Sequence, residues 1–205
     1  MPATVDHEAR RRHIADIAAD LIAQGGMENA TIRNVAATAG YSTAIVTHYF
    51  AHKRDLLLWA YRASAQATQR RFDAVQANDP DDLIAALCAF LPDTPDGIKA
   101  WRVYFAFWRA TVSDPEMAAE QRWWQANALA IIGAVASRQP GMTTAQDRVA
   151  RMLLAIVQGI ATQAALDQDH WSAQEQHRAL AIQVDAILRQ PSPAIALSAP
   201  NAELL

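Results

Sequence analysis

Two short apolar segments on either side of a glycine constrain this chain more than any other part of it. The stretch 31–57 reads TIRNVAATAGYSTAIVTHYFAHKRDLL. Thr31 and Ser42 each stand where a side-chain oxygen caps the start of a helix. Gly40 ends the first helix after about two turns, in the left-handed conformation that glycine tolerates. Two such short helices joined by a glycine-containing turn predict a helix-turn-helix.

The second helix of this pair is expected to place Ile45 and Tyr49 on its inner face, with Phe50 nearby, and small or polar side chains on its other faces. A short helix with such an outer surface suits the major groove of DNA. Lys53 begins the next helix, where the helix dipole also favours a phosphate. The same residue types also form ordinary caps and solvated surfaces, so the pattern alone leaves both interpretations open.

The remaining sequence continues in helical periods and predicts an all-α chain of about nine helices. Hydrophobic residues make up 52% of the 205 residues and glycine occurs only 7 times, which favours helices around a sizeable core. The expected helices span 7–24, 32–39, 43–50, 53–76, 81–91, 97–113, 115–138, 144–168 and 172–189. The expected domains are a helix-turn-helix domain at 1–55 with helix 53–76 as its connector, an effector-binding and dimerisation domain at 56–190, and a flexible tail at 191–205.

Charge, cysteine count and missing motifs exclude several classes of protein. The formal net charge of −3 means that a contact with nucleic acid must come from a local surface. Cys88 is the only cysteine, so the sequence predicts neither an internal disulfide nor a cysteine metal cluster. His48 and His52 have the spacing of metal ligands on a helix, but the expected helix break between them argues against a metal site.

The sequence contains no glycine-rich phosphate loop, nucleophile elbow or zinc-protease motif. We therefore expect a protein without catalytic activity, cofactor or metal. Acidic residues interrupt the N-terminus before an apolar signal core can form, and no segment reaches about 18 uninterrupted apolar residues. The expected location is the cytoplasm, without a membrane partner.

Residues 10–61 resemble a known family. The stretch 31–57, preceded by IAADLIAQGGMENA, is similar to the DNA-binding domain of TetR-family transcriptional repressors. The similarity includes the Gly-Gly turn, the threonine cap, the Ala-Gly before the turn, the Tyr-Phe pair and the lysine of the following helix. YSTAIVTHYFAHKRDLL is most similar to the choline-sensing branch of the family, which represses betaine synthesis, and WRVYFAFWRATVSDPEMA at 101–118 resembles the effector domain of that branch more loosely.

The resemblance implies a ligand-responsive repressor that binds palindromic double-stranded operator DNA as a homodimer. Carried over position by position, the implied DNA contacts are Thr31, Arg33, Ser42, Thr43, Thr47, His48, Tyr49 and Lys53. At His52, related proteins often carry a small or acidic residue, which leaves a phosphate contact there open. Two alternatives also stay open: an activator with the same fold, and a helical small-molecule-binding protein that has lost specific DNA binding.

An aromatic stripe marks the predicted effector site. Four rings recur at i, i+3, i+4 and i+7 of one helix and two more follow in the next: Trp101, Tyr104, Phe105, Trp108, Trp123 and Trp124. A cavity lined by such rings attracts a quaternary ammonium ion through cation–π interactions, and the resemblance adds choline as a candidate effector. Simple packing of large aromatic side chains in a core explains the same pattern, so this alternative remains.

Two apolar rows near the C-terminus predict the dimer interface. They consist of Leu153, Val157 and Ile160 on one helix and Leu180, Val184 and Ile187 on the next. Antiparallel pairs of such helices from two copies form a four-helix interface. Burial within a single protomer produces the same pattern, so that alternative also remains.

Overall fold

The computed structural model describes residues 3–140 and 146–189, and every regular element within them is an α-helix. The helices are α1 (Ala3–Gly25), α2 (Ile32–Ala39), α3 (Thr43–Tyr49), α4 (Lys53–Asn78), α5 (Leu83–Cys88), α6 (Pro95–Thr111), α7 (Pro115–Ala136), α8 (Gln146–Leu166) and α9 (Ala173–Arg189). The expected all-α class is confirmed. The predicted tail at 191–205 lies outside the described residues.

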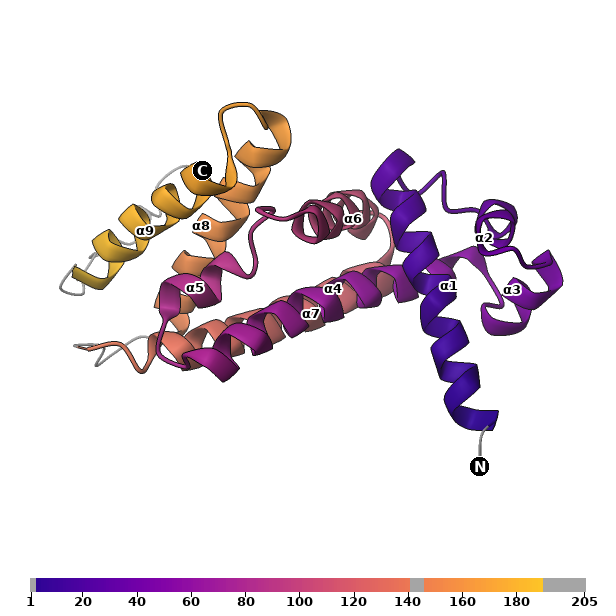
Figure 1. The fold of residues 1–205 in the computed structure, drawn as a ribbon, viewed down its shortest axis with the longest axis horizontal. Coiled ribbons are helices and arrows are strands. Elements are labelled where there is room, and N and C mark those ends of the chain that lie inside the picture. Colours follow the sequence, from indigo (N-terminus) through magenta and orange to yellow (C-terminus); the bar gives the residue numbers. More distant parts are fainter. Residues whose placement is uncertain (1–2, 141–145, 190–205) are drawn as a thin grey trace, which may run out of the picture.

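The helices form an elongated arrangement with α1, α2 and α3 at one end and α8 and α9 at the other (Figure 1). Between the ends, α4 and α7 run side by side in the same direction. Arg54 pairs with Glu116 where both helices begin, and Arg138 donates to Gln76 where both end. The continuous helix α4 therefore reaches from the helix-turn-helix into the second domain.

Local capping explains why the first two short helices begin and end where they do. The Thr31 hydroxyl accepts a hydrogen bond from the Asn34 backbone N–H at 3.1 Å, and Ser42 accepts one from Ile45 at 3.3 Å. Gly40 has φ +68°, the left-handed conformation that ends α2. These contacts confirm the predicted caps and glycine turn.

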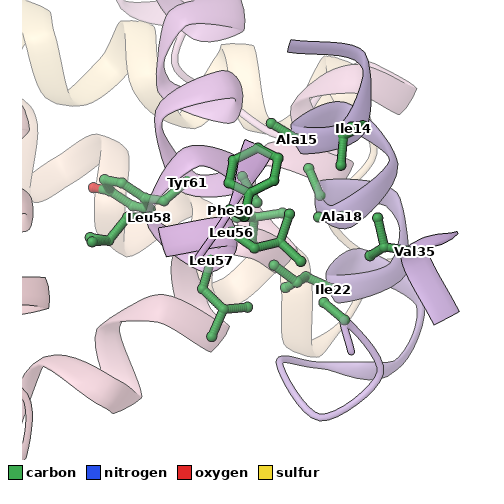
Figure 2. Close-up of a cluster of buried hydrophobic side chains, with 14 of the residues drawn as sticks. Ile14, Ala15, Ala18, Ile22, Val35, Phe50, Leu56, Leu57, Leu58 and Tyr61 are labelled. Carbon is green, nitrogen blue, oxygen red and sulfur yellow. The ribbon is translucent and has the colours of Figure 1, made fainter. Parts of the chain in front are cut away.

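A first hydrophobic cluster joins the helix-turn-helix to α4 (Figure 2). Ile14 from α1, Val35 from α2, Phe50 after α3 and Leu56 from α4 are all fully buried in it. Each such side chain contributes roughly 1.5–3 kcal/mol relative to an exposed position. Tyr61 lies at the edge of this cluster, and Figure 2 shows its hydroxyl pointing away from the other side chains. The cluster holds α3 in one position relative to α4.

The expected inner face of α3 is wrong by one residue. Ile45 is 39% exposed, whereas Val46 and Phe50 are fully buried. Phe50 follows the last helical turn with an extended backbone, φ −134° and ψ 103°, so its ring enters the core from beyond the helix. Val46 shares that direction, which turns Ile45 outward and leaves Tyr49 half-buried.

A second hydrophobic cluster forms the core of the other domain, between α5, α6, α7, α8 and α9. Leu153 and Val157 of α8 and Leu180 of α9 have no exposed surface, and Val184 is only 1% exposed. Because these four side chains are already covered within one protomer, they have no surface left for a second copy. This part of the predicted dimer interface is therefore wrong, and burial in the protomer explains the apolar rows.

The other two residues of the predicted interface also pack toward this cluster. Ile160 is 7% exposed, and Ile187 is half-buried against the cluster. The outward surfaces of α8 and α9 instead carry Met152, Leu166 and Ile182 as exposed large apolar residues.

Among the described residues, one segment, Asp147–Leu166 of α8, is long and apolar enough to cross a membrane by length and composition alone. The core helix of a folded domain meets the same criterion, and one face of α8 is buried in the second cluster through Leu153, Val157 and Ala161. The packing accounts for the apolar character of this helix.

Candidate nucleic-acid interface and effector pocket

The residues predicted to contact DNA lie together around α3 and the starts of α2 and α4. Those with exposed side chains are Arg33, Ser42, Thr43, Thr47 and His48, and those that are half-buried are Thr31, Tyr49 and Lys53. The caps of α2 and α3 fix the backbone on which these side chains stand. The arrangement offers hydroxyl, imidazole and cationic groups on one short helix and its neighbours, as contacts to base edges and phosphates require.

Two details of α3 restrict its side chains. The Thr47 hydroxyl lies 3.1 Å from the carbonyl oxygens of both Thr43 and Ala44, to which it donates, so its oxygen remains available as an acceptor. The centre of the His7 ring of α1 lies 4.5 Å from the centre of the Tyr49 ring and 5.8 Å from that of the His48 ring. No sequence pattern predicts the contact of His7, because it joins residues about forty positions apart.

The basic residues around the helix-turn-helix have different partners. Lys53 lies 3.8 Å from the exposed carboxylate of Glu28, a loose pairing that leaves its ammonium group available. Arg54 instead pairs with Asp114 at 3.0 Å and Glu116 at 3.3 Å, which ties the start of α4 to the start of α7. Position 54 therefore serves the junction between the two domains, and Lys53 stays the candidate phosphate contact.

A cavity between α4, α6, α7 and α8 contains most of the predicted aromatic site. It has about 80 Å³ open to water-sized molecules. Four of the six predicted rings line it: Trp101, Tyr104, Trp108 and Trp124. Tyr61 and Phe90 add two more rings, which the aromatic pattern in the sequence did not predict. On α4 the lining positions recur as Tyr61, Ala65 and Thr68, a helical spacing that would have identified this wall.

Hydrogen bonds connect the polar groups of the cavity wall. The Gln121 side-chain oxygen accepts from the Tyr61 hydroxyl and, at 2.7 Å, from the Trp108 indole N–H. Tyr104 donates from its hydroxyl to the Ser64 carbonyl oxygen at 3.2 Å and lies 2.8 Å from the Thr68 hydroxyl. Burial raises the pKa of Tyr104 to about 12, so its hydroxyl stays protonated and neutral.

None of the described residues that line the cavity carries a formal charge. Glu120, an ionic group beside the cavity wall, accepts from the Trp124 indole N–H at 2.9 Å and from the Arg62 guanidinium at 2.6 and 2.8 Å. Hydrogen bonding to Arg62 lowers the pKa of the Glu120 carboxyl, and the two charges compensate each other. The cavity therefore presents aromatic faces and neutral polar groups to a ligand.

The structure does not bring the remaining two predicted rings to this cavity. Phe105 faces a separate groove of about 800 Å³ between the end of α1, α6 and the connection from α8 to α9. Trp123 is 61% exposed and contacts Trp124 with the ring centres 4.7 Å apart. Successive helical residues point about 100° apart, so Trp124 turns inward and Trp123 outward.

Within the described residues, no group of three or more His, Cys, Asp or Glu side chains is arranged to hold a metal ion. Cys88 is half-buried, and burial raises the pKa of its thiol to about 12. A thiol in this state is a weak nucleophile.

The fold and the site together define a helix-turn-helix protein with a cavity lined by aromatic rings beside α4. A model of bacterial regulatory proteins of the TetR family matches residues 14–59, and a model of the C-terminal domain of BetI-type transcriptional repressors matches residues 80–189, more than half of the chain. The chain therefore belongs to the TetR family of transcriptional regulators, with a C-terminal domain of the BetI type.

Three similar proteins illustrate the breadth of this family. The regulator PksA of Bacillus subtilis is 32% identical over 110 residues, which cover 52% of this chain and 54% of PksA. The regulator BetI of Stenotrophomonas maltophilia is 32% identical over 126 residues, covering 60% of this chain and 64% of that protein. A regulator from Saccharomonospora viridis, crystallised with choline, has a TM-score of 0.73 at 22% identity and covers 87% of this chain and 96% of its own.

The aligned part of this chain spans about half to two thirds of the length of these two curated relatives. The likeness to the crystallised regulator shows the fold alone, since its identity lies below 25%. Membership in a family of transcriptional regulators agrees with the expectation of a protein without catalytic activity.

Proposed function

We propose that this protein is a ligand-responsive transcriptional repressor that binds palindromic operator DNA as a homodimer in the cytoplasm. The observation that carries the proposal is the continuous helix α4. It begins beside the helix-turn-helix and, at Tyr61, lines the aromatic cavity. A change in the cavity therefore has a direct mechanical route to α3, and family membership supplies the class of activity.

The proposed DNA contacts divide into two kinds. Thr43, Thr47 and His48 extend from the exposed side of α3 and read base edges in the major groove. The remaining contacts position the protein on the backbone of the duplex through hydroxyl, cationic and helix-start groups: Thr31, Arg33, Ser42, Tyr49 and Lys53. Two copies must place their α3 helices about 34–36 Å apart to enter successive major grooves.

The proposed effector is a small quaternary ammonium ion such as choline. Rings with electron-rich faces surround the cavity, and no charged side chain among its described lining residues competes with them. The choline complex of the Saccharomonospora viridis regulator supports this chemistry. PksA and BetI match this chain with equal identity, so similarity alone does not select the effector, and the aromatic wall is the stronger argument.

The proposed mechanism is a shift between two arrangements of α4. The effector releases DNA only to the extent that it binds the arrangement with unsuitable α3 spacing more tightly. The outward apolar residues Met152, Leu166 and Ile182 of α8 and α9 are the proposed core of the dimer interface in place of the buried rows.

Selection of duplexes from a random pool by the purified protein tests this proposal, followed by a challenge of the selected sites with choline. Recovery of a palindrome that choline releases supports both the repressor and its effector. A palindrome that choline does not release keeps the DNA-binding regulator and excludes this effector. If no sequence is enriched, the DNA-binding function is wrong, and a ligand-binding protein without specific DNA recognition takes its place.

A further inference from the structure

Gln121 occupies a special place in the cavity wall because one of its atoms joins three helices. It belongs to α7, and its side-chain oxygen accepts hydrogen bonds from Tyr61 of α4 and Trp108 of α6. All three side chains line the cavity. A displacement of this oxygen therefore changes hydrogen bonds to α4 and α6 at the same time.

The partners of Gln121 determine which way its amide points. The indole N–H of Trp108 can only donate, so the atom that faces it at 2.7 Å must be the amide oxygen rather than the nitrogen. The Tyr61 hydroxyl donates to the same oxygen and occupies its second lone pair. The acceptor capacity of the side chain is thus filled by the protein itself.

The amide nitrogen of Gln121 has no hydrogen-bond acceptor among the described residues of the chain. Its two N–H groups are donors on a side chain that lines the cavity beside the rings of Tyr61, Trp108 and Trp124. A cationic ligand held by these rings brings its polar end to such donors only if that end carries a hydrogen-bond acceptor, such as a hydroxyl or carboxylate oxygen.

We propose that Gln121 reads the polar end of a small ammonium effector through its amide N–H groups and passes its occupancy to α4 through Tyr61. The inference rests on the proposed function and deepens it, because it names the chemistry that the cavity selects. A ligand with an oxygen near its ammonium group is favoured over a bare tetraalkylammonium ion. The rings alone treat both ligands as similar cations.

Tyr61 is suited to the second part of this role. Its ring stacks on Phe107 with the ring centres 4.0 Å apart and belongs to the first hydrophobic cluster, the one that holds the helix-turn-helix. Its hydroxyl points out of that cluster, as Figure 2 shows, and reaches Gln121. A ligand that draws Gln121 toward itself therefore moves or breaks a hydrogen bond attached to the core beneath α3.

Ligand selectivity is the first test, with choline, glycine betaine and tetramethylammonium as probes of the wild-type protein. Tryptophan fluorescence or calorimetry measures the three dissociation constants. We expect choline to bind about tenfold more tightly than tetramethylammonium, the effect of about one hydrogen bond. Equal affinities for these two cations would overturn the reading role of Gln121.

Two substitutions of the same residue separate its groups. Gln121→Glu retains an acceptor for Tyr61 and Trp108 but removes the N–H donors and adds a negative charge. This variant should bind tetramethylammonium more tightly than the wild type and glycine betaine more weakly, because the carboxylate of glycine betaine can only accept hydrogen bonds. Gln121→Met removes both functions, and circular dichroism checks that it folds. An undiminished affinity of Gln121→Glu for glycine betaine contradicts the proposal even if Gln121→Met is unstable.

Tyr61→Phe removes only the hydroxyl and tests the path to α4. The measurement is the ratio of operator affinities without and with saturating choline, which does not depend on how tightly choline binds. We expect this ratio to fall about tenfold, whereas Trp123→Phe, outside the cavity on α7, should leave it unchanged. An unaltered ratio in Tyr61→Phe would refute the relay.

If the wild-type protein binds its palindrome but none of the three ammonium compounds, the effector chemistry of the proposed function fails, and this inference fails with it.

Discussion

The two hydrophobic clusters of this chain are built for different tasks. The first packs apolar side chains from α1, α2, α4 and the end of α3 against one another and against the adjoining parts of α6 and α7. The second adjoins a cavity whose wall includes hydroxyl, amide and indole N–H groups. A close-packed core holds α3 in one orientation, as a fixed spacing of DNA grooves requires. A core with internal space and exchangeable hydrogen bonds can adopt two arrangements at small cost.

Tyr61 connects the first cluster to the cavity, because its ring packs in the cluster and its hydroxyl lies at the cavity wall. Two ion pairs, Arg54 with Asp114 and Arg62 with Glu120, link α4 to the first part of α7 and the residue before it, on either side of Tyr61 in the sequence of α4. The comparison therefore predicts that substitutions in the first cluster affect folding, and that substitutions in the cavity affect the response to ligand.

Removal of a ring from the first cluster should have the largest effect. Phe50→Ala leaves a cavity at a fully buried position and is expected to lower the free energy of unfolding by about 3–5 kcal/mol. Chemical denaturation followed by circular dichroism measures the loss. Trp123→Ala, at an exposed position, is the control and should cost less than about 1 kcal/mol. Similar losses in both variants would mean that the first cluster is not the rigid part.

A larger side chain in the cavity should weaken effector binding far more than it lowers the stability of the fold. Ala128 of α7 lines the cavity and is half-buried, so Ala128→Leu is expected to weaken effector binding at least about tenfold while DNA binding persists. The larger side chain also overpacks its surroundings, which is expected to lower the free energy of unfolding by roughly 1–3 kcal/mol. Ala130→Leu makes the same change at an exposed position of the same helix. Calorimetry on both variants should show lost effector binding only in the first.

The helix-turn-helix could be predicted in detail because its signals are local. Thr31, Ser42 and Gly40 each act on backbone groups within a few residues, so their sequence spacing already contains the geometry. The buried face of α3 lies one residue away from the predicted one, because Phe50 reaches the core from an extended backbone beyond the helix. A helical period cannot anticipate a residue that has left the helix.

The cavity could be predicted only in part because it depends on contacts between distant helices. Periodicity placed Trp101, Tyr104 and Trp108 on one side of α6, but Tyr61 and Gln121 join them only through packing. The apolar rows of α8 and α9 were assigned to a dimer because a helical pattern does not distinguish burial by the same chain from burial by a partner. Leu153 and Leu180 are buried by the same chain.

Base reading and backbone binding should be separable on the helix-turn-helix surface. His48→Ala removes a group that is proposed to read base edges and is expected to change the preference at one base pair by about 1–3 kcal/mol. Lys53→Ala removes a proposed phosphate contact, so all duplexes should bind more weakly alike, and the slope of log K against log salt should fall by about 1. Titrations of matched and altered duplexes at several salt concentrations measure both. An unchanged salt slope in Lys53→Ala would contradict the phosphate contact.

The smallest expected effect concerns the ion pair beside the cavity. Hydrogen bonding to Arg62 lowers the pKa of Glu120 in the folded protein, so this carboxylate stabilises the fold above its ordinary pKa of 4.5. That contribution is lost as the pH falls from about 4.5 through the lower folded value, because the unfolded chain then binds the proton more readily. The Arg62 side chain is 37% exposed, so solvent screening keeps the contribution below about 1 kcal/mol.

Glu120→Gln should therefore flatten the acidic part of the stability profile while leaving the rest of the profile nearly parallel to that of the wild type. Denaturation at closely spaced pH values between about 3 and 6 measures this difference. Glu116→Gln, at the exposed pair with Arg54, is the matched control. If the acidic slopes of Glu120→Gln and the wild type coincide, the bond to Arg62 does not stabilise the fold. The junction between the clusters then depends on the Tyr61 contacts rather than on this charge pair.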